Sequence, residues 1–317
     1  MIDIDDIRAA CAVIAGEAVV TPVLRSDRLD ALTGSTVFCK DESQQRAGAF
    51  KFRGAFNRLS LIPPDERSRG VVAVSSGNHG AAVACAARIL GMAATVHVPA
   101  DVARAKRTLI ESFGARIVTF DRATPDREAA ARRQVAETGA TFVHPFEDPM
   151  VMAGQGTAAL ELHEQIGALE VLLVPMSGGG LMAGCATAMH RLDPTCELIG
   201  VEPSAADDTQ RSFAAGEVVR IAQPDTIADG LAVTAPGAAT FAINRRLVTD
   251  VVTVTDGQMI DAMRVARDLL DRRLEPSGVA GLAAVLDDPS RFRGRRVGII
   301  LSGGNIDDAR FDALIAG

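Results

Sequence analysis

Short runs of aliphatic and β-branched residues recur along this chain, and each is followed by a Gly- or Ser-containing turn and then by an Ala-rich stretch. Such repetition of strand, turn and helix predicts parallel sheets covered by helices. Ligands bind to sheets of this kind at the carboxyl ends of the strands, where these turns lie. The expected strands are 71–74, 94–98, 116–120, 171–175, 197–201 and 296–301, and the expected helices are 81–90, 103–113, about 126–138 and 181–191.

The length of the chain predicts two lobes, because 317 residues are many for one compact core. Pro63 and Pro64 interrupt the pattern near a first boundary, and Pro145 and Pro149 interrupt it near a return crossing. We therefore predict a large lobe of residues 1–60 and 148–317 and a small mobile lobe of residues 61–147.

Composition argues against several classes of protein. The formal net charge of −7 without a basic stripe argues against nucleic-acid binding. No apolar run reaches the roughly 18 residues of a membrane span, and the acidic N-terminus is unlike a secretory signal. The five cysteines are scattered and never in CxxC spacing, which is typical of reduced thiols in a cytoplasmic protein.

Lys51 is the strongest candidate for a reactive side chain. It lies between Phe50 and Phe52, with Gly48 and Gly54 on either side. A lysine held among aromatic rings loses its proton more easily, and a neutral amine can attack the aldehyde of a cofactor such as pyridoxal phosphate (PLP). The alternative is a helix lysine whose stem passes core phenylalanines.

Two turns have the composition of ligand loops. Residues 177–180, Ser-Gly-Gly-Gly, follow an apolar strand and open a helix, so their N–H groups suit a phosphate; the alternative is a tight turn. Residues 75–80, Ser-Ser-Gly-Asn-His-Gly, suit a substrate carboxylate, with Asn78 placed to donate to a phenolate oxygen. An N-cap with a turn is the alternative there.

Two further turns follow strands. Ser302, in Leu-Ser-Gly-Gly-Asn, is suited to bond a neutral ring nitrogen, unless this is a plain terminal turn. Glu202, the Ala206 carbonyl and Asp208 offer oxygen ligands for a hard cation. Composition alone favours an acidic solvated loop for that last segment.

One motif matches a cofactor-binding pattern without the sequence context that the pattern requires. Residues 154–159, Gly-Gln-Gly-Thr-Ala-Ala, fit the GxGxxA dinucleotide fingerprint. The preceding stretch contains two prolines and is a poor strand, and no acidic residue follows a second strand at the expected distance. A nicotinamide cofactor is therefore not expected.

Together these motifs resemble the serine/threonine dehydratase and serine racemase family, the fold-type II (tryptophan synthase β-like) PLP enzymes. The likeness covers essentially the whole chain. It is carried, in this order, by residues 49–55, 75–79, 153–157, 177–181, 202–203, 228–230 and 302–305. It implies an α/β fold of two lobes, each with a mainly parallel sheet flanked by helices, a homodimer, and a small β-hydroxy amino acid as the substrate.

The resemblance also implies a role for each matched position. Lys51 would carry the PLP aldehyde as a Schiff base and act as base, with Phe50 against the ring, Asn78 on the ring oxygen and Ser302 at the ring nitrogen. The phosphate would be held by Ser177, Gly178, Gly179, Gly180 and Leu181. Ser75, Ser76, Gly77 and His79 would take the substrate carboxylate. Glu202, Ala206 and Asp208 match the Mg²⁺ or Ca²⁺ site of metal-dependent members.

Departures from the family pattern leave the exact activity open. The leading interpretation is an ammonia-lyase that converts L-threonine and L-serine to 2-oxo acids and ammonia, which Phe146 favours. Ser76 is the residue type that racemases place opposite the lysine, so serine racemase is the first alternative. Arg127 falls where a second carboxylate can be met, so a 3-hydroxyaspartate dehydratase is another, although Arg127 also reads as a surface arginine. A non-catalytic nucleotide or PLP carrier is the alternative from a different class.

Overall fold

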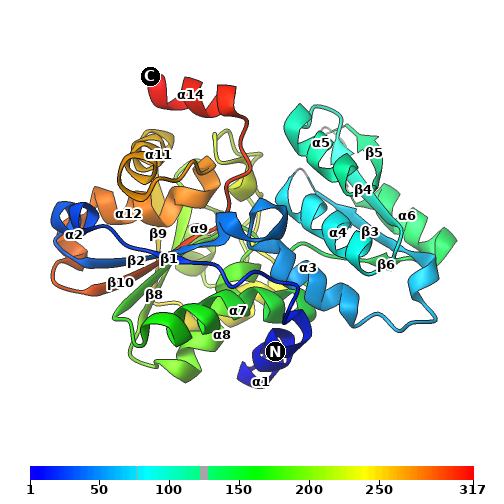
Figure 1. Ribbon diagram of the computed structural model, residues 1–317, viewed down its shortest axis with the longest axis horizontal. Helices are drawn as coiled ribbons and strands as arrows, with labels where there is room; N and C mark the ends of the chain where they lie inside the picture. The colour runs from blue at the N-terminus through cyan, green and yellow to red at the C-terminus, as the bar shows by residue number, and fades with distance from the viewer. Residues whose placement is uncertain (76, 122–127) are drawn as a thin grey trace.

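The structure is a computed structural model that describes residues 1–75, 77–121 and 128–317. Its chain forms two separate sheets, each covered by helices (Figure 1). Both sheets are mainly parallel, so the predicted α/β class with two flanked sheets is confirmed.

The larger sheet has six strands in the order β1-β2-β10-β7-β8-β9. β1 is antiparallel to β2, and the other four neighbouring pairs are parallel. The carboxyl ends of the parallel strands therefore meet at one edge. The strands are β1 (Val23–Leu24), β2 (Thr36–Asp41), β7 (Val171–Pro175), β8 (Glu197–Pro203), β9 (Asp250–Val254) and β10 (Arg296–Leu301).

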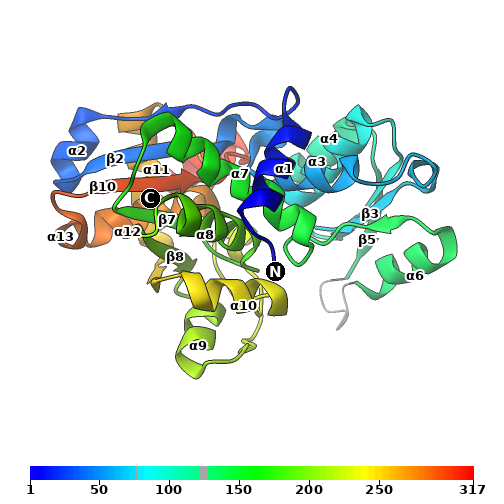
Figure 2. The same ribbon diagram turned by 90° about the horizontal axis from the view of Figure 1, so that it is seen from below.

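Helices cover both faces of this sheet, and successive side chains of each strand point to opposite faces. Leu173 and Ile299 belong to the core under one set of helices, whereas their neighbours Leu172 and Ile300 belong to the core under the other. The first set is α2 (Asp27–Thr33), α11 (Asp256–Leu270), α12 (Ala280–Asp287), α13 (Pro289–Phe292) and α14 (Asp308–Ala316). The second is α1 (Ile4–Ile14), α7 (Pro149–Ile166) and α8 (Gly180–Leu192), with α9 (Asp208–Ala215) and α10 (Ala238–Leu247) beside it (Figure 2).

The smaller sheet is entirely parallel, in the order β5-β4-β3-β6. Its strands are β3 (Val71–Val74), β4 (Ala94–Pro99), β5 (Arg116–Phe120) and β6 (Thr141–Phe142). The main core of this part lies under α3 (Lys51–Ser60), α4 (Asn78–Ile89) and α5 (Arg104–Ser112), and α6 (Ala129–Thr138) covers Val72 on the other face. α3 also packs against α7, so this one helix joins the two sheets (Figure 1).

The expected strands 71–74, 116–120, 171–175 and 296–301 have the bounds that the sequence predicts. The helix expected at 81–90 begins earlier, at Asn78, so the polar turn before it is shorter than the sequence suggests. β1, β2, β6 and β9 were not predicted. β2 ends in Lys40 and Asp41, two fully buried charged residues that break its apolar pattern.

The GxGxxA motif lies inside α7 and not at a strand-to-helix turn. A Cβ at Gly154 would come within 2.6 Å of the Gly54 Cα, and one at Gly156 within 2.7 Å of the Gly184 carbonyl oxygen. These glycines therefore allow α3, α7 and α8 to approach closely, which explains the motif without a dinucleotide.

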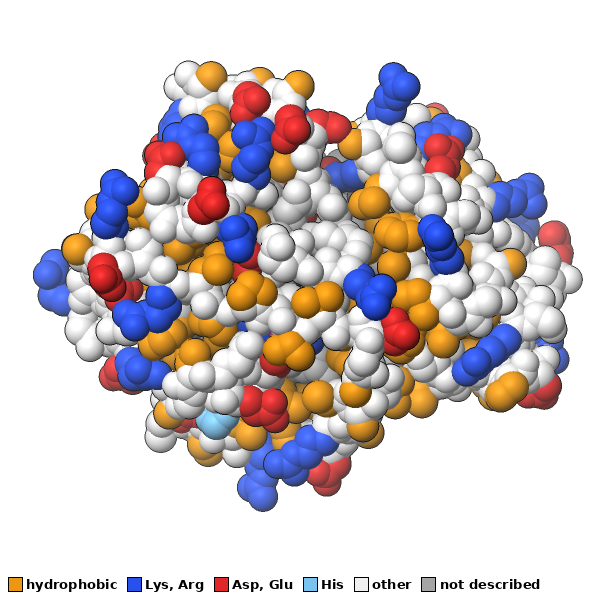
Figure 3. All heavy atoms as spheres, in the orientation of Figure 1, with side chains coloured by type: hydrophobic (Ala, Val, Ile, Leu, Met, Phe, Trp, Pro, Cys, Tyr) orange, Lys and Arg blue, Asp and Glu red, His pale blue; other side chains and the backbone are white. Residues whose placement is uncertain are grey.

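The surface carries basic and acidic side chains interspersed over the face shown in Figure 3, without a region of one sign. No described helix has the length and apolarity to cross a membrane. The five cysteines are free thiols, and four of them are buried.

Candidate active site

Lys51 is the first residue of α3, and Phe50 precedes the helix as its N-cap. The Lys51 Nζ donates a hydrogen bond of 2.9 Å to the Pro145 carbonyl and lies 5.1 Å from the centroid of the Phe50 ring. No ion pair to Lys51 occurs among the described residues. Burial lowers the pKa of the amine to about 8. A fraction of this lysine is therefore neutral near neutral pH, as a nucleophilic amine requires.

The segment that holds Lys51 also covers the glycine loop at 177–180. The Phe146 ring lies where a Cβ on Gly178 would point, so this approach needs glycine. The carbonyls of Gly178 and Gly179 accept hydrogen bonds from the Thr240 hydroxyl (2.5 Å) and the Asn244 amide (3.1 Å). The loop and the 144–146 segment thus lie together at the start of α8.

The N–H groups of residues 178–181 have no hydrogen-bond partner within the part of the chain that the structure describes. Gly179 has a φ of +89°, and its position as the N-cap of α8 turns the loop into the first helical turn. Free N–H groups at a helix N-terminus form an anion-binding site. These residues therefore fit a phosphate group, with the half-buried Ser177 hydroxyl beside them.

Ser302 directly follows β10 and lies next to Phe50, whereas Asn78 opens α4 and lies beside Gly303. The Phe50 N–H donates to the Ser302 carbonyl at 3.1 Å, and Ala49 forms a bridge with Gly303. A Cβ on Gly303 would lie 3.2 Å from the Asn78 Nδ2. The Ser302 hydroxyl makes a long bond of 3.4 Å to the Ser277 carbonyl, so it is only weakly held. The structure therefore brings Phe50, Asn78 and Ser302 together.

The loop before α4 has a local hydrogen bond of its own, from the Gly77 N–H to the Ser75 hydroxyl at 3.1 Å. His79 points into the interior, where its Nε2 lies 2.9 Å from the Val143 carbonyl. Burial, with a smaller effect of Lys51, lowers the pKa of His79 to about 3, so the imidazole is neutral. Ser76 and Arg127, both predicted site residues, lie outside the described residues.

The three predicted metal ligands lie at the end of β8 and in the segment that follows it, where they form a cluster of their own. Glu202 and Asp208 are fully buried, and Ala206 is buried between them in the chain. Both oxygens of Asp208 lack a hydrogen-bond partner among the described residues. Burial, with the Asp208 charge second, raises the pKa of Glu202 to about 8, and burial raises that of Asp208 to about 7.

An orphaned buried carboxylate beside a second one fits a bound cation. Glu202 is itself partly satisfied, because its oxygens accept from the backbone N–H groups of Thr209 (3.2 Å) and Gln210 (2.9 Å). Within the described ranges, however, no group of three or more His, Cys, Asp or Glu side chains is arranged to hold a metal. A cation here would need carbonyl or water oxygens as further ligands.

Two side chains at this site were missed by the sequence analysis. Glu275 accepts a hydrogen bond of 2.5 Å from the Asn78 amide, and Lys106 of α5 forms an ion pair of 2.5 Å with Asp229. Neither lies in a turn after a predicted strand, so no local pattern marks them. The tertiary fold alone places them beside Asn78.

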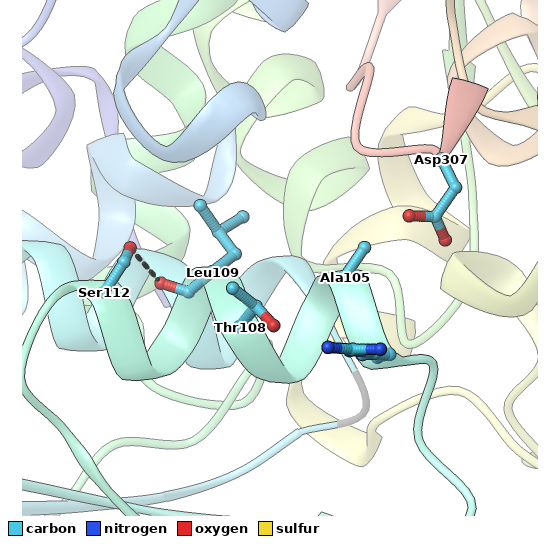
Figure 4. Close-up of a pocket in the computed structure, with 6 residues that line it drawn as sticks. Ala105, Thr108, Leu109, Ser112 and Asp307 are labelled. Atoms are coloured by element: carbon cyan, nitrogen blue, oxygen red, sulfur yellow. Dashed lines mark hydrogen bonds between the residues drawn. The ribbon is translucent and has the colours of Figure 1, made fainter.

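A hollow of about 450 Å³ lies along α5 and not at Lys51. Ala105, Thr108, Leu109 and Ser112 line one side of it, and Asp307 faces them from the segment before α14 (Figure 4). No predicted site residue lines it. The site is therefore identified by its side chains and N–H groups and not by the volume of the hollow.

Comparison with known proteins agrees with this geometry. Residues 14–303 match the family model described as pyridoxal-phosphate dependent enzyme. An L-threo-3-hydroxyaspartate ammonia-lyase from a Pseudomonas species is 46% identical over 98% of both chains. The structure of maize serine racemase has a TM-score of 0.94 at 40% identity, covering 99% of this chain and 97% of that one. The T.th. threonine deaminase has a TM-score of 0.91 at 41% identity, covering 96% and 99%.

These matches confirm the resemblance stated from the motifs. They extend over nearly the whole chain and combine sequence identity with the same fold. The chain belongs to the fold-type II family of pyridoxal-phosphate-dependent enzymes, among ammonia-lyases and racemases of hydroxy amino acids.

Proposed function

We propose that this enzyme eliminates water from small L-β-hydroxy amino acids and releases a 2-oxo acid and ammonia. The observation that carries the proposal is Lys51, a buried amine with a lowered pKa and no carboxylate partner among the described residues. In a family that uses PLP, such a lysine is suited both to hold the cofactor and to move a proton.

The residues around Lys51 fit PLP. The unpartnered N–H groups of residues 178–181 would hold its phosphate, Phe50 would pack on its ring, and Asn78 would donate to its ring oxygen. Bound PLP supplies an electron sink that makes the hydrogen on the substrate Cα acidic. Lys51 would accept this proton, and the weakly held Ser302 hydroxyl would face the ring nitrogen.

The substrate carboxylate would be held by the loop before α4, through the Ser75 hydroxyl and the backbone N–H of His79. The Gly77 N–H would join them by giving up its hydrogen bond to Ser75. The buried His79 ring serves the structure by bonding Val143. Ser76 is proposed as a further contact. The leaving hydroxyl departs from Cβ with a proton, and the unsaturated amine then takes up water and loses ammonia, so the net products are one 2-oxo acid and one ammonium ion.

L-threonine and L-serine are the proposed substrates from the sequence, and the T.th. threonine deaminase supports them. L-threo-3-hydroxyaspartate is supported by the Pseudomonas relative, with Arg127 proposed to meet its second carboxylate. The test is release of 2-oxo acid from each compound by the purified holoprotein. The ratio of kcat/KM values assigns the substrate, and no oxo acid from any of the three contradicts the proposal. An Arg127→Met variant should lose activity on the dicarboxylate more than on serine.

Serine racemase is a second candidate, supported by Ser76 and by the maize enzyme. A hydroxyl opposite the lysine would return a proton to the other face of Cα. Chiral analysis of a reaction with L-serine tests this. D-serine that disappears in a Ser76→Ala variant, while oxo acid continues, supports racemisation; no D-serine from the parent protein removes the candidate.

We further propose that Glu202, Ala206 and Asp208 bind Mg²⁺ or Ca²⁺. The two orphaned oxygens of Asp208 support this. At 100 times its dissociation constant, a cation that binds the folded state alone adds about 2.7 kcal/mol to the free energy of unfolding. Thermal unfolding with each ion and with a chelator should show this rise, and Asp208→Asn should remove it. An equal response of the variant would contradict the site.

The division into a large lobe of residues 1–60 and 148–317 and a mobile small lobe of residues 61–147 remains our proposal, as do a homodimer and a cytoplasmic location. The separate sheets and their connection through α3 support the division. Scattering of the holoprotein with and without a substrate analogue would detect closure of the small lobe, and sedimentation would give the oligomeric state.

A further inference from the structure

Glu275 is a buried carboxylate that the proposed chemistry does not use. It precedes the 3₁₀ turn Pro276–Val279 and is 2% exposed. One of its oxygens, Oε1, accepts the 2.5 Å hydrogen bond from the Asn78 Nδ2. The other, Oε2, has no hydrogen-bond partner in the described part of the chain and lies 4.0 Å from the Lys106 Nζ. A buried carboxylate this poorly satisfied is costly, so a compensating role is expected.

Its partner Asn78 is held from both ends. The Asn305 Nδ2 donates to the Asn78 Oδ1 at 2.9 Å and to the Ala47 carbonyl at 2.7 Å. Reversal of the Asn78 amide would place its oxygen against the Glu275 carboxylate and its NH₂ against the NH₂ of Asn305. Both contacts would then be repulsive, so the two neighbours specify one orientation of the amide.

In that orientation one N–H of Asn78 is used by Glu275 and the second is left to donate elsewhere. We propose that Glu275 is a positioning residue, which fixes the Asn78 amide so that this second N–H is aimed at the ring oxygen of bound PLP. This inference rests on the proposed function, in which Asn78 binds that oxygen. Glu275 itself acts through Asn78 and is not a catalytic residue.

The charged groups around Glu275 come from three elements: Lys106 on α5, Asp229 in the turn Asp229–Leu231, and Arg310 on α14. Burial raises the pKa of Glu275 to about 7, although Lys106 acts in the opposite direction. A protonated carboxyl keeps a carbonyl oxygen that can accept from Asn78. Orientation of the amide therefore needs an acceptor at this position more than it needs the charge, and a glutamine can supply that acceptor.

The experiment is a double-mutant cycle on the holoprotein between Glu275→Leu and Asn78→Ala. The readouts are the PLP dissociation constant and the visible absorbance maximum of the bound cofactor. Asn78→Ala should weaken PLP binding about tenfold, the loss of one hydrogen bond. Glu275→Leu should weaken it by a similar factor and shift the absorbance in the same direction. In the double variant Glu275→Leu should add less than about twofold.

The conservative variant Glu275→Gln should restore the absorbance maximum of the parent protein, since it keeps an acceptor. Glu42→Gln is the matched control, because Glu42 is another fully buried carboxylate but is bonded to Arg53. It should leave the absorbance maximum unchanged. If Glu275→Leu fails to fold, Glu275→Ala replaces it in the cycle, because it adds no bulk against Gly303.

The outcomes separate this inference from the proposed function. A parent protein with no borohydride-sensitive absorbance contradicts the proposed function itself. A parent protein that binds PLP, with Glu275 and Asn78 effects that simply multiply in the double variant, overturns the positioning role alone. A spectral shift in Glu42→Gln equal to that in Glu275→Leu would also overturn it, because any buried carboxylate would then give the effect.

Discussion

Lys40 and Lys51 are two buried lysines with opposite surroundings. Burial lowers the pKa of both amines. The Lys40 Nζ bonds Glu161 at 2.5 Å, Gln165 at 2.8 Å and the Thr21 carbonyl at 2.7 Å. Lys51 has the Pro145 carbonyl and a nearby aromatic ring. A buried lysine paired with a carboxylate is held in its charged form, whereas one without such a partner loses its proton more easily, which supports the role proposed for Lys51.

The buried carboxylates divide in the same way. Glu42 pairs with Arg53 at 2.7 Å, and Arg53 also reaches Glu161 at 3.0 Å. Glu202 and Asp208 have no cation of the chain beside them among the described ion pairs, and Asp208 has no hydrogen-bond donor for its side chain. The charges of the paired cluster are neutralised within the protein, whereas the unpaired carboxylates support the proposed cation site.

The most direct test of this comparison is to replace each of the two lysines in turn. Lys51→Ala should lower oxo-acid formation by about a thousandfold or more, because the group that moves the proton is lost. The free energy of unfolding of the apoprotein should not fall by more than about 1 kcal/mol, because no ion pair is lost and the desolvation cost of the buried amine is removed. Borohydride reduction and steady-state assays measure the first effect, and urea unfolding measures the second.

Lys40→Met is the matched control for that exchange. It should keep the cofactor and the activity of the folded protein but lower the stability, because Glu161 loses a partner. Normal activity in Lys51→Ala, or full loss of the cofactor in a folded Lys40→Met protein, would reverse the two assignments.

A smaller effect, on stability alone, is expected at Arg53. Arg53→Met removes the shared partner of Glu42 and Glu161 and leaves uncompensated carboxylates, at a cost of about 3–5 kcal/mol. Urea unfolding of the apoprotein measures this. The double replacement Arg53→Met with Glu42→Leu should recover part of the loss. A loss below about 1 kcal/mol would mean that the paired cluster is no more structural than a surface ion pair.

The smallest effect is the pH dependence caused by Lys51. Its pKa is about 8 in the folded protein against a usual value of 10.5, so between these values the unfolded chain binds more protons. Folding stability of the parent apoprotein should therefore rise with pH in this window relative to Lys51→Met, by about 1 kcal/mol per pH unit at most. Urea unfolding at pH 8 and pH 9 compares the two proteins. An unchanged difference would place Lys51 in a more aqueous setting.

The sequence predicts the fold class well because strand, turn and helix signals are local. The strands at 71–74 and 171–175 have uninterrupted apolar composition and appear as expected. β2 was missed since Lys40 and Asp41 interrupt its pattern, and only the fold reveals that Glu161 and Arg272 pair with them. Burial of a charge through a partner more than a hundred residues away leaves no local signal.

The residues of the candidate site were likewise predicted only where a local sequence motif marks them. Lys51, Asn78 and the glycine loop lie in sequence motifs that can be recognised at the starts of helices. In the structure, the residues next to these motifs contact one another. Glu275 and Lys106 lie in no recognisable motif. Each joins the site only through a contact between segments that are distant in the chain. His79 was predicted from its place in a polar turn, yet its ring bonds Val143 in the interior.

The position of β10 in the larger sheet has a consequence for synthesis of the protein. Residues 296–301 lie between β2 and β7, and the bridge from Gly303 to Ala49 lies two residues before Lys51. During translation β2 leaves the ribosome long before its neighbour β10 is made. The smaller sheet, made from residues 71–142, has all its strands long before this. The larger sheet can therefore be completed only after β10 has emerged, later than the smaller sheet.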